Sequence, residues 1–116
     1  MKRLYVVVRP DLPVGLQMAQ ACHAVREFTA QHPAVDVGEN LVVLHAEAYE
    51  IVDLTDRAAR EGLAYALFFE PDLPGGQVTA AAFSGDAQKM LSSLPLACRP
   101  RAPGGGRPLI VQTYRT

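Results

Sequence analysis

The sequence predicts an α/β fold of three layers, in which a mixed four-stranded sheet carries helices on both of its faces. Apolar, β-branched runs alternate with segments whose apolar residues recur at helical spacing. Strands joined through a helix run parallel, whereas the third and fourth strands are close enough in sequence to form an antiparallel hairpin. A chain of 116 residues suits one compact domain.

The first two elements have the clearest patterns. Residues 4–8 are a continuous apolar run and predict a buried strand, which Pro10 and Pro13 end. Residues 14–31 carry apolar side chains at i, i+3, i+4 and i+7 and predict a helix with one buried stripe. The expected stripe consists of Met18, Ala21, Cys22, Val25 and Phe28.

The later elements complete the order β-α-β-α-β-β-α, without an internal repeat. We expect strands over 41–44, 63–69 and 78–83, and a helix over 47–61 that Gly62 ends. A short helix follows, capped by Ser84 or Asp86 and reaching about residue 92. The side chains expected to face inward from the second helix are Ile51, Leu54, Thr55 and Ala58.

We place the domain at residues 1–98 and a Pro/Gly-rich tail at 99–116, in which 109–114 would add an edge strand, pair with a second copy in a homodimer or stay loose. The net charge of −1 argues against a general nucleic-acid binder, and we expect no DNA partner. The tail, however, contains no acid, so it either contacts phosphate or is a solvated extension. Its basic residues are Arg99, Arg101, Arg107 and Arg115.

Several classes of protein fit poorly. No apolar run approaches the roughly 20 residues of a membrane span, and the chain begins without a secretory signal pattern, so we expect a cytoplasmic protein and no membrane partner. Cys22 and Cys98 predict two reduced thiols. Cys22 and His23 point about 100° apart on a helix, and His32 and His45 lack ligands at a recognisable spacing. We therefore expect no metal and no cofactor.

Two loops, 9–15 and 70–77, are expected at one edge of the sheet, because both follow parallel strands. Gln20 and His23 lie three residues apart on the polar face of the predicted helix and are therefore neighbours. A histidine near carboxylates supplies general acid–base chemistry at neutral pH. The side chains gathered there are Asp11, Gln20, His23, Glu70, Asp72, Gln77 and Thr79.

Each part of this group also has a plain structural reading. Asp11 precedes a helix and would serve as its N-terminal cap. His23 would be an ordinary exposed helix residue, and 70–72 would be ordinary turn chemistry. Only the agreement of the three parts favours a site.

The chain reads Arg9-Pro-Asp11-Leu12 after its first strand and Ala19-Gln20-Ala-Cys-His23-Ala24 in the following helix. These segments resemble the type-2 peptidyl-tRNA hydrolase family, whose first strand runs into Arg-Thr-Asp-Leu, a Gly/Lys-rich turn and a helix with Ala-Gln-x-x-His-Ala. The family's Asp-Ala-Gly-x-Thr-Gln loop and Thr-initiated strand are similar to 70–79, and its closing helix and Leu-rich strand to 87–97. The resemblance covers about residues 3–98, but the turn 12–17 contains no lysine.

The resemblance implies hydrolysis of the ester that joins a peptide, or an N-blocked amino acid, to tRNA. Because an ester already has a good leaving group, the enzyme mainly places a water, accepts its proton and stabilises the oxyanion. His23 or Asp72 would be the base, Gln20 and Thr79 would orient the water or donate to the oxyanion, and Asp11 would fix the helix start and His23. The expected catalytic group consists of His23, Asp72, Gln20, Asp11, Glu70 and Thr79.

Phosphate contacts are expected from Arg9, Arg99 and Arg101, with peptidyl-tRNA as the partner. Two alternatives remain open. One is a non-catalytic module of the same fold that binds RNA or a protein, and the other is a hydrolase of another small ester or amide. The acidic body and the turn without lysine favour these alternatives, whereas the Gln-x-x-His helix favours the enzyme.

Overall fold

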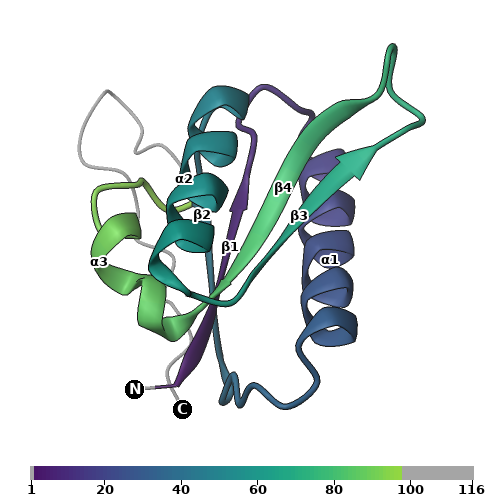
Figure 1. Ribbon diagram of the computed structural model, residues 1–116. Helices are drawn as coiled ribbons and strands as arrows, with labels where there is room; N and C mark the ends of the chain where they lie inside the picture. The colour runs from purple at the N-terminus through teal and green to yellow at the C-terminus, as the bar shows by residue number, and fades with distance from the viewer. Residues whose placement is uncertain (1, 98–116) are drawn as a thin grey trace.

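The computed structural model describes residues 2–97 and has three layers (Figure 1). Its elements follow the predicted order, with boundaries within two residues of those expected up to β4. They are β1 (Arg3–Val8), α1 (Val14–Gln31), β2 (Asn40–His45), α2 (Ala48–Glu61), β3 (Tyr65–Glu70), β4 (Gln77–Ser84), the 3₁₀ turn η1 (Gly85–Ala87) and α3 (Gln88–Leu91).

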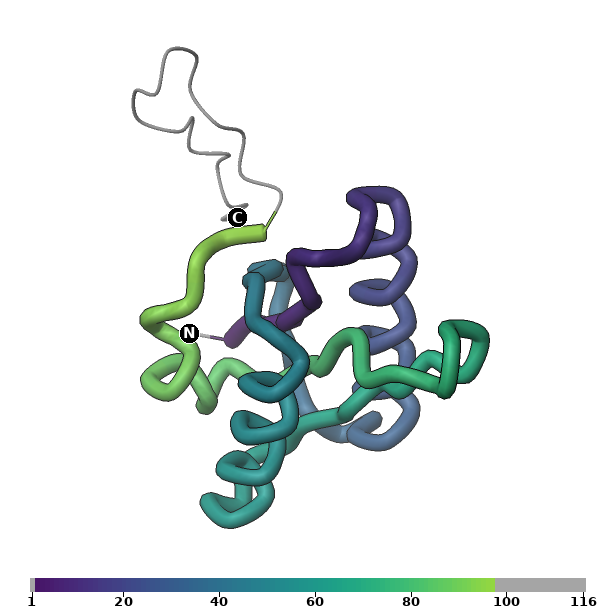
Figure 2. Tube along the Cα trace, turned by 90° about the horizontal axis from the view of Figure 1, so that it is seen from above, coloured from purple at the N-terminus to yellow at the C-terminus, as the bar shows by residue number. Residues whose placement is uncertain are grey.

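The sheet is mixed and has the strand order β2-β1-β4-β3. β1 and β2 are parallel, and β4 lies between β1 and β3 and runs antiparallel to both. Helix α1 covers one face, and α2 and α3 lie on the other, as the two views show (Figures 1 and 2). The predicted fold class is therefore confirmed.

The central strand β1 divides the apolar core between the two faces. Successive side chains of a strand point to opposite faces, so Leu4, Val6 and Val8 pack with Phe28 of α1. Tyr5 and Val7 instead pack with the buried residues of α2, β4 and α3. The three alanines of β4, residues 80–82, are fully buried, and their small side chains let the helices approach the sheet.

The buried face of α1 differs from the predicted stripe. Met18 is 62% exposed and Cys22 is also exposed, whereas two glutamines face inward. The predicted stripe was wrong for Met18 and Cys22, whereas Phe28 is buried and Ala21 and Val25 pack against the same core. The two glutamines can face inward because their amides are hydrogen-bonded inside the protein, which removes the cost of burying them. The buried residues of this helix are Gln17, Gln20, Ala24 and Phe28.

The outer edge of β2 pairs with the segment that follows α3. Leu96 forms an antiparallel bridge with Leu44, and the amide of Ala97 donates to the carbonyl of Val43 at 2.8 Å. This short pairing protects part of an edge strand. The additional strand and the homodimer expected from 109–114, and the arginines of the tail, lie outside the described residues. Between residues 2 and 97, no helix is long and apolar enough to cross a membrane.

Two glycines, one at the start of α1 and one at the end of α2, test the assigned helix ends. Gly62 ends α2 in the left-handed region, at φ 73°, whereas Gly15 lies in the first turn of α1, and a Cβ at either position meets nothing within 4 Å. We expect Gly62→Ala to lower the free energy of unfolding by about 1–2 kcal/mol, because the left-handed conformation disfavours a Cβ. Gly15→Ala should raise it by about 0.5–1 kcal/mol. Urea denaturation of both variants checks this, and equal effects would contradict the assigned helix ends.

Candidate active site

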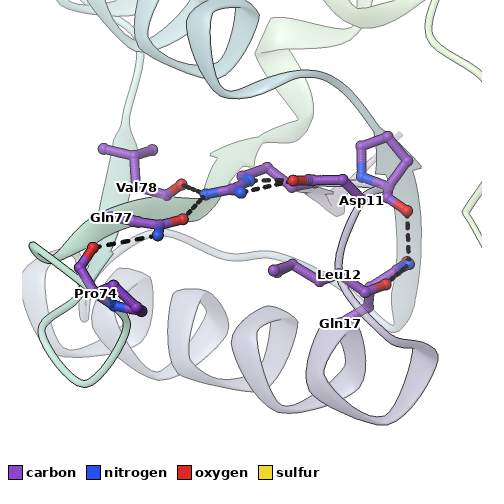
Figure 3. A network of polar contacts seen from close by, with 8 residues as sticks. Asp11, Leu12, Gln17, Pro74, Gln77 and Val78 are labelled. Atoms are coloured by element: carbon purple, nitrogen blue, oxygen red, sulfur yellow. Dashed lines mark hydrogen bonds and ion pairs between the residues drawn. The ribbon is translucent and has the colours of Figure 1, made fainter.

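The turn after β1 and the start of β4 meet at one edge of the sheet, where Arg9 hydrogen-bonds Asp11 and Gln77, both of which Figure 3 labels. Its Nε and Nη2 donate to the two carboxylate oxygens of Asp11 at 3.0 and 2.7 Å. Its Nη1 donates to Oε1 of Gln77 at 2.7 Å and to the carbonyl of Val78 at 3.1 Å. Arg9 therefore links the turn after β1 to the start of β4.

This arrangement changes the expected functions of Arg9 and Asp11. Four of the roughly five N–H donors of a guanidinium are used inside the protein, and the side chain of Arg9 is 13% exposed. Little of Arg9 is left for a phosphate. Asp11 does not fix the helix start, since α1 has Pro13 as its N-cap without a side-chain bond. The hydrogen bonds from Arg9 instead hold the pKa of Asp11 below its ordinary value.

A buried chain of hydrogen bonds connects α1 with β4 and β3. The hydroxyl of Thr79 donates to Oε1 of Gln20 at 2.5 Å, and Nε2 of Gln20 donates to Oε1 of Glu70 at 2.9 Å. Thr79 is fully buried and Gln20 is 1% exposed. The expectation that Gln20 lies on a polar, solvent-facing side of the helix was therefore wrong. Its amide holds the Glu70 carboxylate in a fixed position.

A β-bulge in β4 directs the side chain of Thr79 toward Gln20 and so into the hydrogen-bonded series that ends at Glu70. Phe68 pairs with Ala80 but the next residue, Phe69, pairs with Val78, so Thr79 has no partner on β3. Thr79 and Ala80 consequently both face α1, where regular alternation would place them on opposite faces. Bulges near functional sites commonly redirect a side chain in this way.

His23 lies one helical turn after Gln20, on the side of α1 that faces β3. Its ring stacks on Phe68 with the ring centroids 4.7 Å apart and the planes at 12°. The ring is half-buried, and within residues 2–97 neither of its nitrogens has a hydrogen bond. The pKa of Glu70 is lowered first by the hydrogen bond from Gln20, then by the amide of Asp72 and by attraction to His23. A half-buried imidazole within electrostatic range of a carboxylate can accept a proton from a water.

Asp72 joins the group through its backbone rather than its carboxylate. Its amide donates to Oε2 of Glu70 at 3.2 Å, whereas its exposed side chain forms no hydrogen bond or ion pair with the described residues. No group of three or more metal-ligating side chains that could hold a metal occurs between residues 2 and 97. Glu70, rather than Asp72, therefore carries the carboxylate that Gln20 anchors.

Two contacts at this edge were not found from the sequence. Gln77 meets Arg9 across 68 positions of the chain, and Gln17 meets His45 across 28. His45 had no recognisable partner in the sequence. The spacing of Gln17 and Gln20, three residues apart on one helix, is the signal that would have placed both amides on the same side.

Comparisons with known proteins support the fold alone. No protein-family model matches the chain, and no curated protein matches it. A solved structure of a protein of unknown function from Agrobacterium tumefaciens is similar, with a TM-score of 0.64 and 14% sequence identity. The match covers 83% of this chain and 97% of that one. The layered α/β architecture is therefore shared, without information on activity.

We expect Gln20→Leu to raise the pKa of Glu70 toward its ordinary value of 4.5, because the largest cause of the lowering is removed. Carbon-13 NMR titration of the Glu70 carboxyl checks this. Since the lowered pKa stabilises the fold above pH 4.5 and that contribution is lost as the pH falls, the variant should also lose less stability on acidification.

The matched control is Gln31→Leu, which removes an exposed glutamine of the same helix whose amide donates to Glu27. It should leave the titration of Glu70 unchanged. An unaltered Glu70 titration in Gln20→Leu would show that the buried amide does not hold the carboxylate.

Proposed function

We propose that this protein hydrolyses an ester, and that its substrate is the ester between a peptide, or an N-blocked amino acid, and tRNA. The observation that carries the hydrolase is the imidazole of His23, which has no hydrogen bond with the described residues and lies within electrostatic range of the anchored carboxylate of Glu70. The Arg9-Pro-Asp11-Leu12 and Gln20-Ala-Cys-His23 segments, through their resemblance to type-2 peptidyl-tRNA hydrolases, support the choice of substrate. The reaction would take place in the cytoplasm.

In this mechanism His23 accepts a proton from a water as that water attacks the ester carbonyl. The Glu70 carboxylate stabilises the resulting imidazolium, in the way that a third group orients and supports a catalytic histidine. His23 then returns the proton to the sugar oxygen that leaves. Gln20 and Thr79 support the Glu70 carboxylate without contacting the ester, because both are buried and their hydrogen bonds are directed at Glu70 and at each other.

A non-catalytic RNA- or protein-binding module is the second candidate. The occupied donors of Arg9 and the turn 12–17, which contains no lysine, weaken tRNA binding at this edge and so favour a partner other than tRNA. A hydrolase of another small ester or amide would use the same pair of residues. Turnover, binding and its salt dependence separate these candidates.

We expect His23→Ala and Glu70→Gln each to lower kcat for a blocked aminoacyl-tRNA by about 100-fold or more, because each removes part of the general base. Asp72→Asn, a second carboxylate in the same loop, is the matched control and should keep kcat within about threefold. Thermal midpoints of all three variants identify any loss that comes from unfolding. Full activity of Glu70→Gln would remove Glu70 from the mechanism, and full activity of Glu70→Gln together with a large loss in Asp72→Asn would give its place to Asp72.

We expect tRNA affinity to depend weakly on salt, with a slope of log K against log salt of about −2 to −4, because few cations are available. Each lost phosphate contact should reduce the slope by about 0.7–0.9, so Arg99→Gln with Arg101→Gln should reduce it by about 1.5. Filter binding between low and moderate salt measures it. Binding without turnover would support the binding module, and neither binding nor turnover would reject tRNA as the substrate.

A further inference from the structure

A second buried amide, that of Gln17, lies on α1 one helical turn before Gln20. Gln17 is 5% exposed, and its Nε2 donates to the carbonyls of Leu12 and Pro10 at 2.7 and 3.3 Å (Figure 3). Its Oε1 lies 2.7 Å from Nε2 of His45, the last residue of β2. One side chain therefore connects the turn after β1, the start of α1 and the end of β2.

The hydrogen-bond partners define the protonation of His45. An amide has two N–H donors and one acceptor oxygen, and a backbone carbonyl only accepts. Because both carbonyls in the turn require the NH₂ group of Gln17, its oxygen faces His45 and needs a donor. Nε2 of His45 therefore carries a proton. Burial lowers the pKa of His45 below its ordinary value, which favours a neutral ring with its single proton on Nε2.

We propose that Gln17 and His45 are a positioning pair for the active site, holding the turn 10–13 and the first turns of α1 in the geometry that the reaction requires. The proposal rests on the proposed hydrolase function. The turn carries Asp11, which Arg9 links to the hairpin of β3 and β4. Gln17 also lies one helical turn before Gln20, so a shift at Gln17 is transmitted to the amide that anchors Glu70.

Loss of the hydrogen bond between Gln17 and His45 is expected to slow the chemical step. Neither Gln17 nor His45 belongs to the group around His23, so neither is expected to contact the reacting ester. Small displacements of positioning residues nevertheless lower kcat strongly, because reacting groups must be held close to their productive geometry. Loss of the pair should therefore reduce kcat and leave KM nearly unchanged.

Two variants of His45 separate its hydrogen bond from its bulk. His45→Gln keeps an N–H at a similar reach from the backbone, whereas His45→Leu fills much of the space without a donor. Nitrogen-15 NMR of the wild-type imidazole reports which ring nitrogen carries the proton, and backbone amide order parameters of Asp11 and Leu12 report the turn. kcat and KM are measured with a blocked aminoacyl-tRNA.

We expect the wild-type ring to carry its proton on Nε2. His45→Leu should lower the order parameters in the turn and reduce kcat about 10-fold to 100-fold, with KM within about twofold. His45→Gln should restore the ordered turn and keep kcat within about threefold. This rescue distinguishes a hydrogen-bonded positioning function from simple packing.

A wild-type proton on Nδ1, or an unchanged turn in His45→Leu, would overturn the proposal, as would a failure of His45→Gln to restore kcat. If His45→Leu does not fold, the tautomer of the wild-type ring and the kcat of His45→Gln still test the proposal. If the wild-type protein does not hydrolyse the ester, the proposed function fails, and the catalytic part of this inference fails with it. In that case the tautomer of His45 and the order parameters of the turn still test whether Gln17 and His45 form the hydrogen-bonded pair.

Discussion

The functional edge of this protein depends on one constraint: the amides that α1 buries must be hydrogen-bonded inside the protein. A buried donor or acceptor without a partner costs about 1–3 kcal/mol, so both glutamines fix what lies around them. Gln20 attaches the helix to Thr79 and Glu70, and Gln17 attaches it to the turn after β1 and to His45. The helix thus aligns the loops that follow three different strands.

The charge of this edge bears on the proposed substrate. Arg9 is balanced by Asp11 and attracted by Glu47, and Glu70 adds a further carboxylate. Such an edge suits an imidazole that must become positively charged during a reaction, since nearby carboxylates stabilise that form. The same charges repel phosphates, so a polyanionic substrate would need cations from elsewhere. Within the sequence, the acid-free segment 99–116 is the richest source of them.

The sequence predicted the layers, the element order and the meeting of two loops, because these depend on periodicity and on the direction of parallel strands. The bounds of α1 were predicted correctly, yet its buried face was not. Burial of Met18 satisfies hydrophobicity alone, whereas burial of Gln20 depends on partners about 50 and 59 residues away. Likewise, no local pattern distinguishes the carboxylate of Glu70 from that of Asp72, since only the packed hairpin determines which one accepts the hydrogen bond from Gln20.

The bulge in β4 implies that this site is encoded partly by chain length. Thr79 reaches α1 because the hairpin has one residue more on β4 than a regular ladder requires. A deletion of one residue would restore the regular ladder and remove the hydroxyl from the helix while leaving both strands paired. During evolution, the site could therefore be lost or gained by an insertion or deletion on an otherwise constant fold.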